Sequence, residues 1–217
     1  MKHFRYIIYL YVFIGVSSAL ADSYNEFFRA IIQDNPASIQ ALLNRGFDPN
    51  SVDERGQPGI SRALILDSFD VALTLARAPS LDVKQRNRAG ETSLMLAAMK
   101  GQEEIFRVLL DRGAEADPAE GWTPLHYGAS GSALPVMRLL LARGVRVDPR
   151  APNGRTPLMM AAAFGDEKAV DMLLVAGADP TARDANGMSS ASLARGGGRE
   201  WLAKRLEAAE AKWKPAR

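Results

Sequence analysis

Apolar positions along the chain fall into pairs of short runs, and each run is followed by a polar turn. The first run of a pair reads LMLAA, LHYGA or LMMAA, and the second reads IFRVLL, VMRLLL or AVDMLL. Runs of this length, with apolar residues three and four positions apart, are typical of short amphipathic helices. Glycine, proline, aspartate and asparagine stand between the runs and favour turns. The pattern predicts a chain built from helix–turn–helix units.

The units recur at a nearly fixed interval. A glycine precedes the first run of each pair, at positions 56, 90, 121, 154 and 187, with separations of 34, 31, 33 and 33 residues. A period of this size indicates one supersecondary unit copied along the chain. Because a single unit cannot bury its apolar face alone, we expect the core to form between stacked neighbours.

Several positions within the unit have definite physical roles. Thr123 and Thr156 stand where a hydroxyl caps the first helix, and a proline follows each of them in the first turn. Gly113, Gly144 and Gly177 end the second helix, where we expect a positive φ. The leucines at 109–110, 139–141 and 173–174 are expected to fill the space between layers.

The segments Gly121–Asp148 and Gly154–Pro180 resemble the ankyrin repeat, whose pattern is G-x-T-P-L-H-x-A-A, a turn glycine, a V-V-x-L-L-L helix and G-A-D. The resemblance extends over about residues 23–210. It implies an all-α ankyrin-repeat solenoid of stacked helix-turn-helix units with β-hairpin or loop fingers. It also implies that His126, in the T-P-L-H position, hydrogen-bonds the turn and braces neighbouring loops.

The beginning of the chain has the features of a secretory signal peptide. Lys2 and Arg5 form a basic start, YIIYLYVFIGV is an apolar run of eleven residues, and residues 19–21 read Ala-Leu-Ala. We expect cleavage after Ala21, export across the inner membrane and a periplasmic location. The alternative is an uncleaved segment that tethers the protein to the membrane, although a bilayer span needs about 20 apolar residues.

The remaining chain is expected to contain six units, of which the first and last are caps. The N-terminal cap lacks the G-x-T-P-L motif, and the last helix of the C-terminal cap carries charges on its outer face. The predicted organisation is a signal peptide at 1–21, an N-terminal cap at 22–53, four repeats within 54–183 (about 54–87, 88–118, 119–151 and 152–184) and a C-terminal cap and tail at 185–217.

Charge and composition narrow the choice of partners. Without residues 1–21 the chain has 25 basic and 25 acidic residues, so no electrostatic attraction to nucleic acid or to an anionic membrane is expected. The chain has no cysteine, which excludes disulfides and thiolate chemistry. Aspartates recur once per unit at the start of each finger, which favours a role in turns over a metal site. We therefore expect no metal and no cofactor.

The resemblance also implies where a partner binds, because ankyrin partners lie across the finger tips and the concave face of the first helices. Trp122 and Phe164 are expected to be apolar anchors, since exposed apolar residues on one face often mark a contact site. Arginines on this face would bind carboxylates. The expected partner-binding residues are Arg88, Glu91, Met99, Lys100, Glu120, Trp122, Asn153, Arg155 and Phe164.

These observations favour an exported, monomeric, non-enzymatic module that binds a protein of unknown identity. One version of this hypothesis is an immunity or inhibitor protein, and another is a protective accessory protein for an enzyme. The enzymatic alternative is a cell-wall hydrolase that uses Glu91 and Glu120. The third hypothesis is a structural, self-associating protein. The finger at 113–121 is two residues shorter than the finger at 144–154. This shortening alters the ridge that a partner would meet, and the alternative interpretation, which is favoured, is sequence drift in a tolerant loop.

Overall fold

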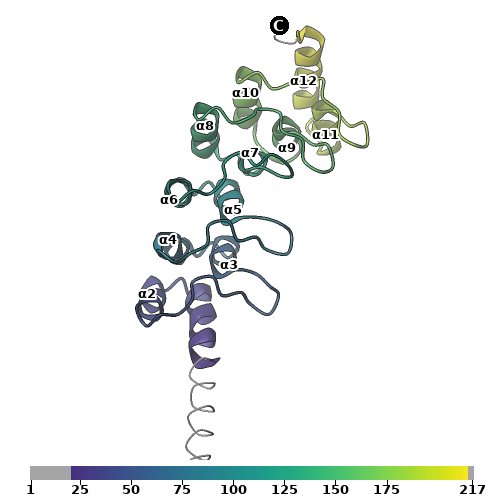
Figure 1. Ribbon diagram of the computed structural model, residues 1–217. Coiled ribbons are helices and arrows are strands. Elements are labelled where there is room, and N and C mark those ends of the chain that lie inside the picture. The colour runs from purple at the N-terminus through teal and green to yellow at the C-terminus, as the bar shows by residue number, and fades with distance from the viewer. Residues whose placement is uncertain (1–20, 215–217) are drawn as a thin grey trace, which may run out of the picture. The chain divides into compact units, whose positions relative to one another are not determined.

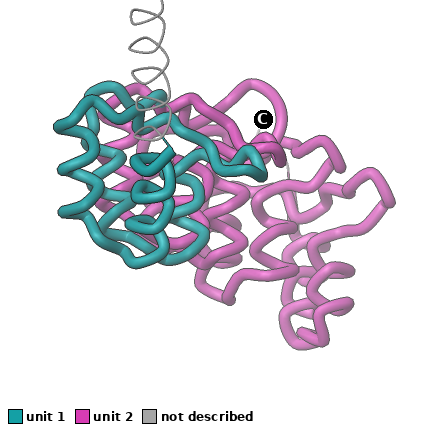
Figure 2. The backbone as a smooth tube through the Cα atoms, turned by 90° about the horizontal axis from the view of Figure 1, so that it is seen from below, with its two compact units in different colours: residues 1–82 teal, residues 83–217 magenta. Residues whose placement is uncertain are grey.

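The computed structural model describes residues 21–214 as short helices joined by loops (Figure 1). The chain divides into two compact units, unit 1 with residues 1–82 and unit 2 with residues 83–217 (Figure 2). The predicted signal peptide lies, apart from Ala21, outside the described residues. Within residues 21–214 every helix is too short or too polar to span a bilayer.

Unit 1 contains two helix pairs. Residues 21–32 are helical and are followed by α2 (Pro36–Asn44), and α3 (Gly59–Ile65) is followed by α4 (Phe69–Arg77). Helix α4 packs against both α2 and α3. The Asn35 side chain accepts the Ser38 N–H at 3.1 Å and so caps α2.

Unit 2 contains four further pairs, in which first helices stack on first helices. Helix α7 packs between α5 and α9, α11 packs on α9, and α8 packs against α6 and α10. Figure 1 shows the first helices in one column and the second helices in another. The elements are α5 (Ser93–Met99), α6 (Glu103–Asp111), α7 (Pro124–Ser130), α8 (Leu134–Ala142), α9 (Pro157–Phe164), α10 (Glu167–Val175), α11 (Ser190–Gly196) and α12 (Glu200–Lys212).

The core of unit 2 lies between the stacked helices. Leu109, Leu140 and Leu173 occupy equivalent places in the second helices and are all 0% exposed. The prediction that the neighbouring leucines fill the same space is wrong for Leu110, Leu139, Leu141 and Leu174, which remain partly exposed. Successive residues of a helix point in directions about 100° apart, so only one leucine of three can point fully inward.

The turns follow the sequence prediction closely. Gly113, Gly144 and Gly177 have φ of 87°, 74° and 91°. Thr156 accepts the Met159 N–H at 3.4 Å, as expected of a helix cap. The all-α class is confirmed for residues 21–214, where the only strand-like pairings are single bridges within two fingers, Val52–Pro58 and Arg86–Thr92.

The ends of the first helices approach the preceding layer closely. A Cβ at Gly131, which follows α7, would lie 1.9 Å from the backbone oxygen of Met99 at the end of α5. Any larger residue at this position requires the backbone of one layer to move. The first helices are thus in near backbone contact where they meet the concave face.

Candidate functional site

His126 is a structural brace, as its motif position predicts. It is 0% exposed, its Nδ1 accepts the Thr123 N–H at 3.1 Å, and its Nε2 lies 3.0 Å from the backbone oxygen of Arg155 in the next finger. Because Nδ1 accepts a hydrogen bond, the proton of the neutral ring is on Nε2, which donates to Arg155. Burial lowers the pKa of His126 to about 4, and Arg146 nearby acts in the same direction. With both nitrogens occupied, the ring has no free position for acid–base catalysis.

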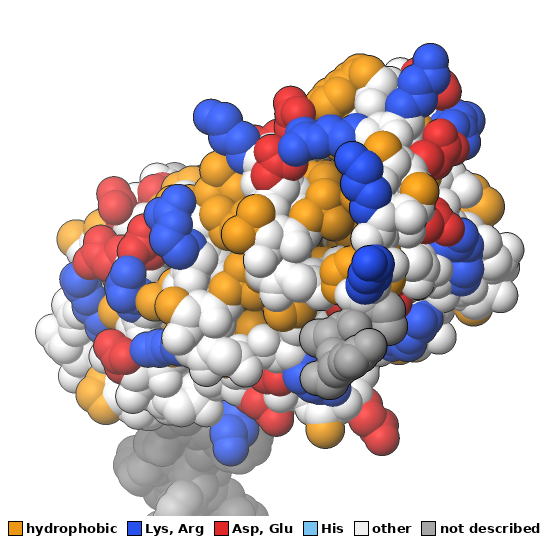
Figure 3. Space-filling model, turned by 90° about the horizontal axis from the view of Figure 1, so that it is seen from above, with side chains coloured by type: hydrophobic (Ala, Val, Ile, Leu, Met, Phe, Trp, Pro, Cys, Tyr) orange, Lys and Arg blue, Asp and Glu red, His pale blue; other side chains and the backbone are white. Residues whose placement is uncertain are grey.

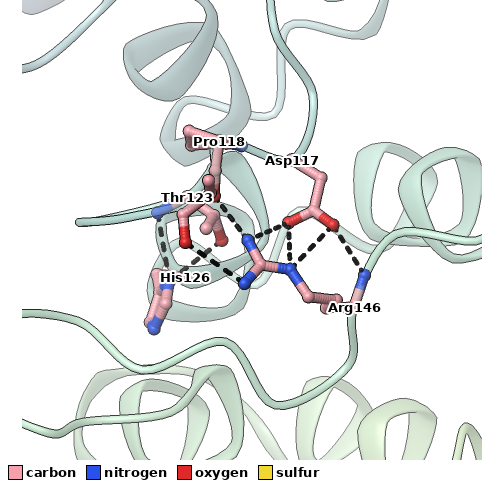
Figure 4. Close-up of polar contacts among 6 residues, drawn as sticks. Asp117, Pro118, Thr123, His126 and Arg146 are labelled. Carbon is pink, nitrogen blue, oxygen red and sulfur yellow. Dashed lines mark hydrogen bonds and ion pairs between the residues drawn. The ribbon is translucent and has the colours of Figure 1, made fainter.

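Arg146 belongs to the finger at residues 144–154, and its side chain binds the short finger at residues 113–121 (Figure 4). Its Nη2 donates to the Pro118 carbonyl at 2.5 Å and to Asp117 Oδ1 at 2.9 Å, and its Nη1 donates to the Ala119 carbonyl at 3.3 Å. The Arg146 backbone N–H also donates to Asp117 Oδ2 at 3.1 Å. This guanidinium lowers the pKa of Asp117, although desolvation of the carboxyl opposes the shift. The contact was not predicted from the sequence.

The predicted role of the recurring aspartates in turns is confirmed for Asp48 and Asp179, whose side chains accept the backbone N–H two residues further on, at 2.9 and 2.8 Å. Two of these aspartates also accept a backbone N–H from the next finger. Asp117 accepts the N–H of Arg146, and Asp148 accepts the N–H of Asp179 at 2.9 Å. Each bond joins one finger to the next. Among residues 21–214 no group of histidine and carboxylate side chains is arranged to hold a metal ion.

Trp122 is partly buried, whereas the sequence placed it at a position that the fold leaves free. Its ring centroid is 5.2 Å from that of His126 and 6.3 Å from that of Tyr127, both with edge-to-face geometry. Such pairs stabilise a fold by about 0.5–1.5 kcal/mol each. Trp122 therefore contributes to the scaffold, and its remaining exposed surface is available for a partner.

Glu91 is also more constrained than the sequence suggested. Its Oε1 accepts a hydrogen bond from the Tyr127 hydroxyl at 2.8 Å, and its Oε2 accepts one from Asn87 Nδ2 at 2.7 Å. Both carboxylate oxygens are thus used by the protein itself, which is unlike an acid positioned for hydrolysis beside Glu120. Tyr127 and Asn87 were missed from the sequence, because the repeat pattern does not show that a residue of α7 and a residue of the finger itself meet at Glu91.

Phe164 has the exposure expected of an apolar anchor. It is the last residue of α9, and 61% of its surface is accessible. The loop before α12 lies beside the end of α9, because Arg199 Nη1 donates to the carbonyls of Ala161 and Ala162 at 3.3 and 3.1 Å. This arrangement fixes the backbone around Phe164 and leaves the aromatic side chain accessible.

The other expected binding residues differ in their exposure and in their contacts within the chain. Arg88, Glu120 and Asn153 are exposed near the finger tips, and Met99 and Lys100 are partly buried at the end of α5. Arg155 is partly engaged within the chain, because its Nε lies 3.5 Å from the buried carboxylate of Asp184. Unit 2 carries all nine residues of the proposed set.

Comparison with known proteins identifies the family. Residues 27–120 and 114–184 match the family model for ankyrin repeats in three copies. The chain belongs to the ankyrin repeat family, whose repeats generally mediate protein–protein interaction and typically form non-enzymatic scaffolds.

The similar curated proteins contain much more than this array. The B-cell lymphoma 3 protein homolog of Mus musculus is 31% identical over 156 residues, which cover 69% of this chain and 35% of that protein. Tyrosine-protein kinase Shark of Drosophila melanogaster is 28% identical over 181 residues, covering 82% of this chain and 19% of the kinase. Protein fem-1 homolog A-like of Mus musculus is 34% identical over 137 residues, covering 62% and 21%. The similarity is therefore confined to a minor part of each relative.

Proposed function

We propose that this protein is an exported, non-enzymatic module that binds a periplasmic protein through the concave face and finger tips of unit 2. The binding surface consists of Arg88, Glu91, Met99, Lys100, Glu120, Trp122, Asn153, Arg155 and Phe164. The basic, apolar and Ala-Leu-Ala features of residues 1–21 support export. Family membership supports a protein partner.

The observation that carries the proposal is the exposure of Phe164. A large apolar side chain that is 61% exposed contributes little to the core, whereas aromatic residues on a binding face often provide much of the binding energy. The near contact between α5 and Gly131 makes the floor of this face rigid. Binding to such a preformed surface requires little rearrangement.

The surface chemistry suits selective contact with one partner. Figure 3 shows hydrophobic side chains gathered near the middle of the face that it draws, with Lys, Arg, Asp and Glu side chains intermingled around them. A mixed surface of this kind disfavours general attraction to polyanions. The partner is thus recognised by shape and local charge, and an enzyme that is inhibited or protected is one such partner.

Capture of partners from periplasmic extract tests this function. The intact protein serves as bait beside two variants, Phe164→Ala and Val175→Ala. Val175 is the matched control, because it is 89% exposed but ends α10, a helix of the second column. We expect a partner that is retained by the wild type and by Val175→Ala and is reduced at least about tenfold by Phe164→Ala.

Three results would contradict the proposal or a part of it. Equal retention by all three baits would show that Phe164 is outside the interface. A chain that stays in the cytoplasm after fractionation of the native cells would remove the periplasmic part of the proposal. Turnover of peptidoglycan fragments by the wild type and its loss in Glu91→Gln would favour the hydrolase instead.

A further inference from the structure

Glu91 is held in a fixed position on the concave face, with capacity to bind one more group. Tyr127 and Asn87 each donate one hydrogen bond to its carboxylate, at 2.8 and 2.7 Å. Asn87 is itself fixed, because its Oδ1 accepts the N–H groups of Ala89 and Glu91 at 3.0 and 2.9 Å. A carboxylate has about four lone-pair sites, so two hydrogen bonds leave room for a further donor.

One aromatic residue contacts this carboxylate, and a second aromatic ring lies beside the first. Tyr127 carries the hydroxyl that binds Glu91, and the Trp122 ring lies 6.3 Å from the Tyr127 ring at an interplanar angle of 81°. Both residues are partly exposed. The faces of indole and phenol rings attract cations, and the attraction is greatest for tryptophan. A fixed carboxylate that is bonded to one such residue, with a second ring beside it, is complementary to a cationic side chain.

The neighbouring basic groups do not cancel this preference. Arg146 is bound to Asp117, and Arg155 lies against Asp184. Glu120 is exposed two residues before Trp122 and adds negative charge to the same finger. Arg88, three residues before Glu91 on the same finger, and Arg86, whose Nη1 donates to the Gly90 carbonyl at 2.6 Å, are basic residues that oppose this preference.

We propose that Glu91, Trp122 and Tyr127 bind an arginine or lysine side chain of the partner protein. The Glu91 carboxylate accepts hydrogen bonds from the cationic group, and the Trp122 ring packs against its planar or methylene surface. This inference rests on the proposed function and refines it. The sequence alone suggested that arginines of this chain bind acidic groups of the partner, whereas the structure engages Arg155 internally and leaves a carboxylate oriented by its neighbours.

The experiment uses random 12-residue peptides displayed on phage and selected on the intact protein. Peptides that also bind the Glu91→Gln/Trp122→Ala double variant are removed. We expect the enriched peptides to share one arginine or lysine. For an arginine peptide, replacing that residue with citrulline, which is neutral and of similar shape, should weaken binding about tenfold.

The Glu91→Gln variant shows whether the cation binds at this carboxylate. Glutamine keeps an oxygen that can accept the Tyr127 hydrogen bond, so the fold is expected to be retained, which circular dichroism checks. Glu91→Gln should weaken the arginine peptide about tenfold and leave the citrulline peptide unchanged. Glu115→Gln removes the same charge at another exposed position of unit 2 and should change affinity less than about twofold.

Three outcomes would overturn the inference. They are the absence of any enriched peptide, enriched peptides without a shared basic residue, and a citrulline effect of equal size in the wild type and Glu91→Gln. A partner whose capture still depends on Phe164 would in those cases leave the proposed function intact. The converse result is also distinguishable. If peptides with a shared arginine or lysine bind through Glu91 but partner capture does not depend on Phe164, the basic-residue site is supported and the Phe164 surface is contradicted.

Discussion

The fingers at residues 113–121 and 144–154 both begin with a glycine of positive φ, 87° and 74°. Different hydrogen bonds then stabilise the conformation of each finger. In the longer finger, the Ala151 N–H donates to the Arg155 carbonyl at 2.9 Å and the Gly154 N–H donates to Ala151 at 2.7 Å. The short finger has Pro118 three residues before its glycine, at the place of Ala151, and proline has no N–H to donate. Arg146 binds the carbonyls of Pro118 and Ala119 instead.

The difference shows that the short finger depends on its neighbour for its conformation. Arg146 extends from the long finger to the short one, and His126, which follows the short finger, donates back to Arg155 in the long finger. Each finger thus supplies a hydrogen bond that the other needs. In an array whose units touch only adjacent units, such contacts couple neighbouring repeats directly. Trp122 follows the short finger, so its position depends on both contacts.

The largest expected effect concerns what the two repeats have in common. Leu140 and Leu173 are both 0% exposed in equivalent second helices, so we expect Leu140→Ala and Leu173→Ala each to lower the free energy of unfolding by about 2–5 kcal/mol. Urea unfolding followed by circular dichroism measures both. A loss below about 1 kcal/mol for one of them would show that the repeats differ in their cores as well as in their fingers.

The second prediction is a pH dependence that originates in the short repeat. The pKa of His126 is about 4 in the folded protein and 6.5 in its unperturbed state, so folding favours the neutral ring. The contribution of His126 to the free energy of unfolding is fully present above pH 6.5. It is lost as the pH falls towards 4, because the imidazole of the unfolded chain binds a proton at a higher pH than the imidazole of the folded chain. We expect a loss of about 3 kcal/mol over this range. Unfolding of wild type and His126→Met between pH 4 and 8 isolates it, and parallel curves would contradict the assignment.

The third prediction compares the two repeats at one equivalent position. The neighbouring repeat has Met159 where the short repeat has His126. His126→Met removes the partners of the Thr123 N–H and the Arg155 carbonyl, so we expect a loss of about 1–3 kcal/mol at pH 7. Met159→Leu is the control and should cost less than about 1.5 kcal/mol. Similar values for the two variants would mean that the imidazole braces neither finger.

The sequence was sufficient for the features that each repeat forms within itself. The helix pairs, the positive φ of Gly113 and the burial of Leu140 follow from local propensity and periodicity, and the T-P-L-H motif placed His126 correctly. Contacts between neighbouring repeats were not predictable in the same way. The role of Arg146 depends on a neighbouring finger that is two residues shorter and contains Pro118, and the hydrogen bond from Tyr127 to Glu91 joins residues 36 positions apart. The shortened finger and its proline were the available signal.

The same reasoning explains why candidate binding residues were harder to place than core residues. Trp122 was expected to be free because the repeat pattern assigns no core role to its position. The rings of His126 and Tyr127 cover part of it, since both extend from α7 towards that finger. Phe164 has no such ring partner among the aromatic pairs of residues 21–214, and its predicted exposure is confirmed. Exposure is a property of the neighbours as much as of the residue.

The smallest expected effect tests the difference between the fingers directly. Arg146→Gln removes the donors to Pro118 and Ala119, so the short finger should open more often. Arg150→Gln in the long finger removes donors to Gly154 and Arg183, but the backbone bond from Ala151 to Arg155 remains. Amide hydrogen exchange at Thr123 should become about five- to tenfold faster in Arg146→Gln, and exchange at Ala151 should change less than about twofold in Arg150→Gln. Equal acceleration in the two fingers would show that the backbone bond of the long finger gives no more protection than the Arg146 side chain gives to the short one.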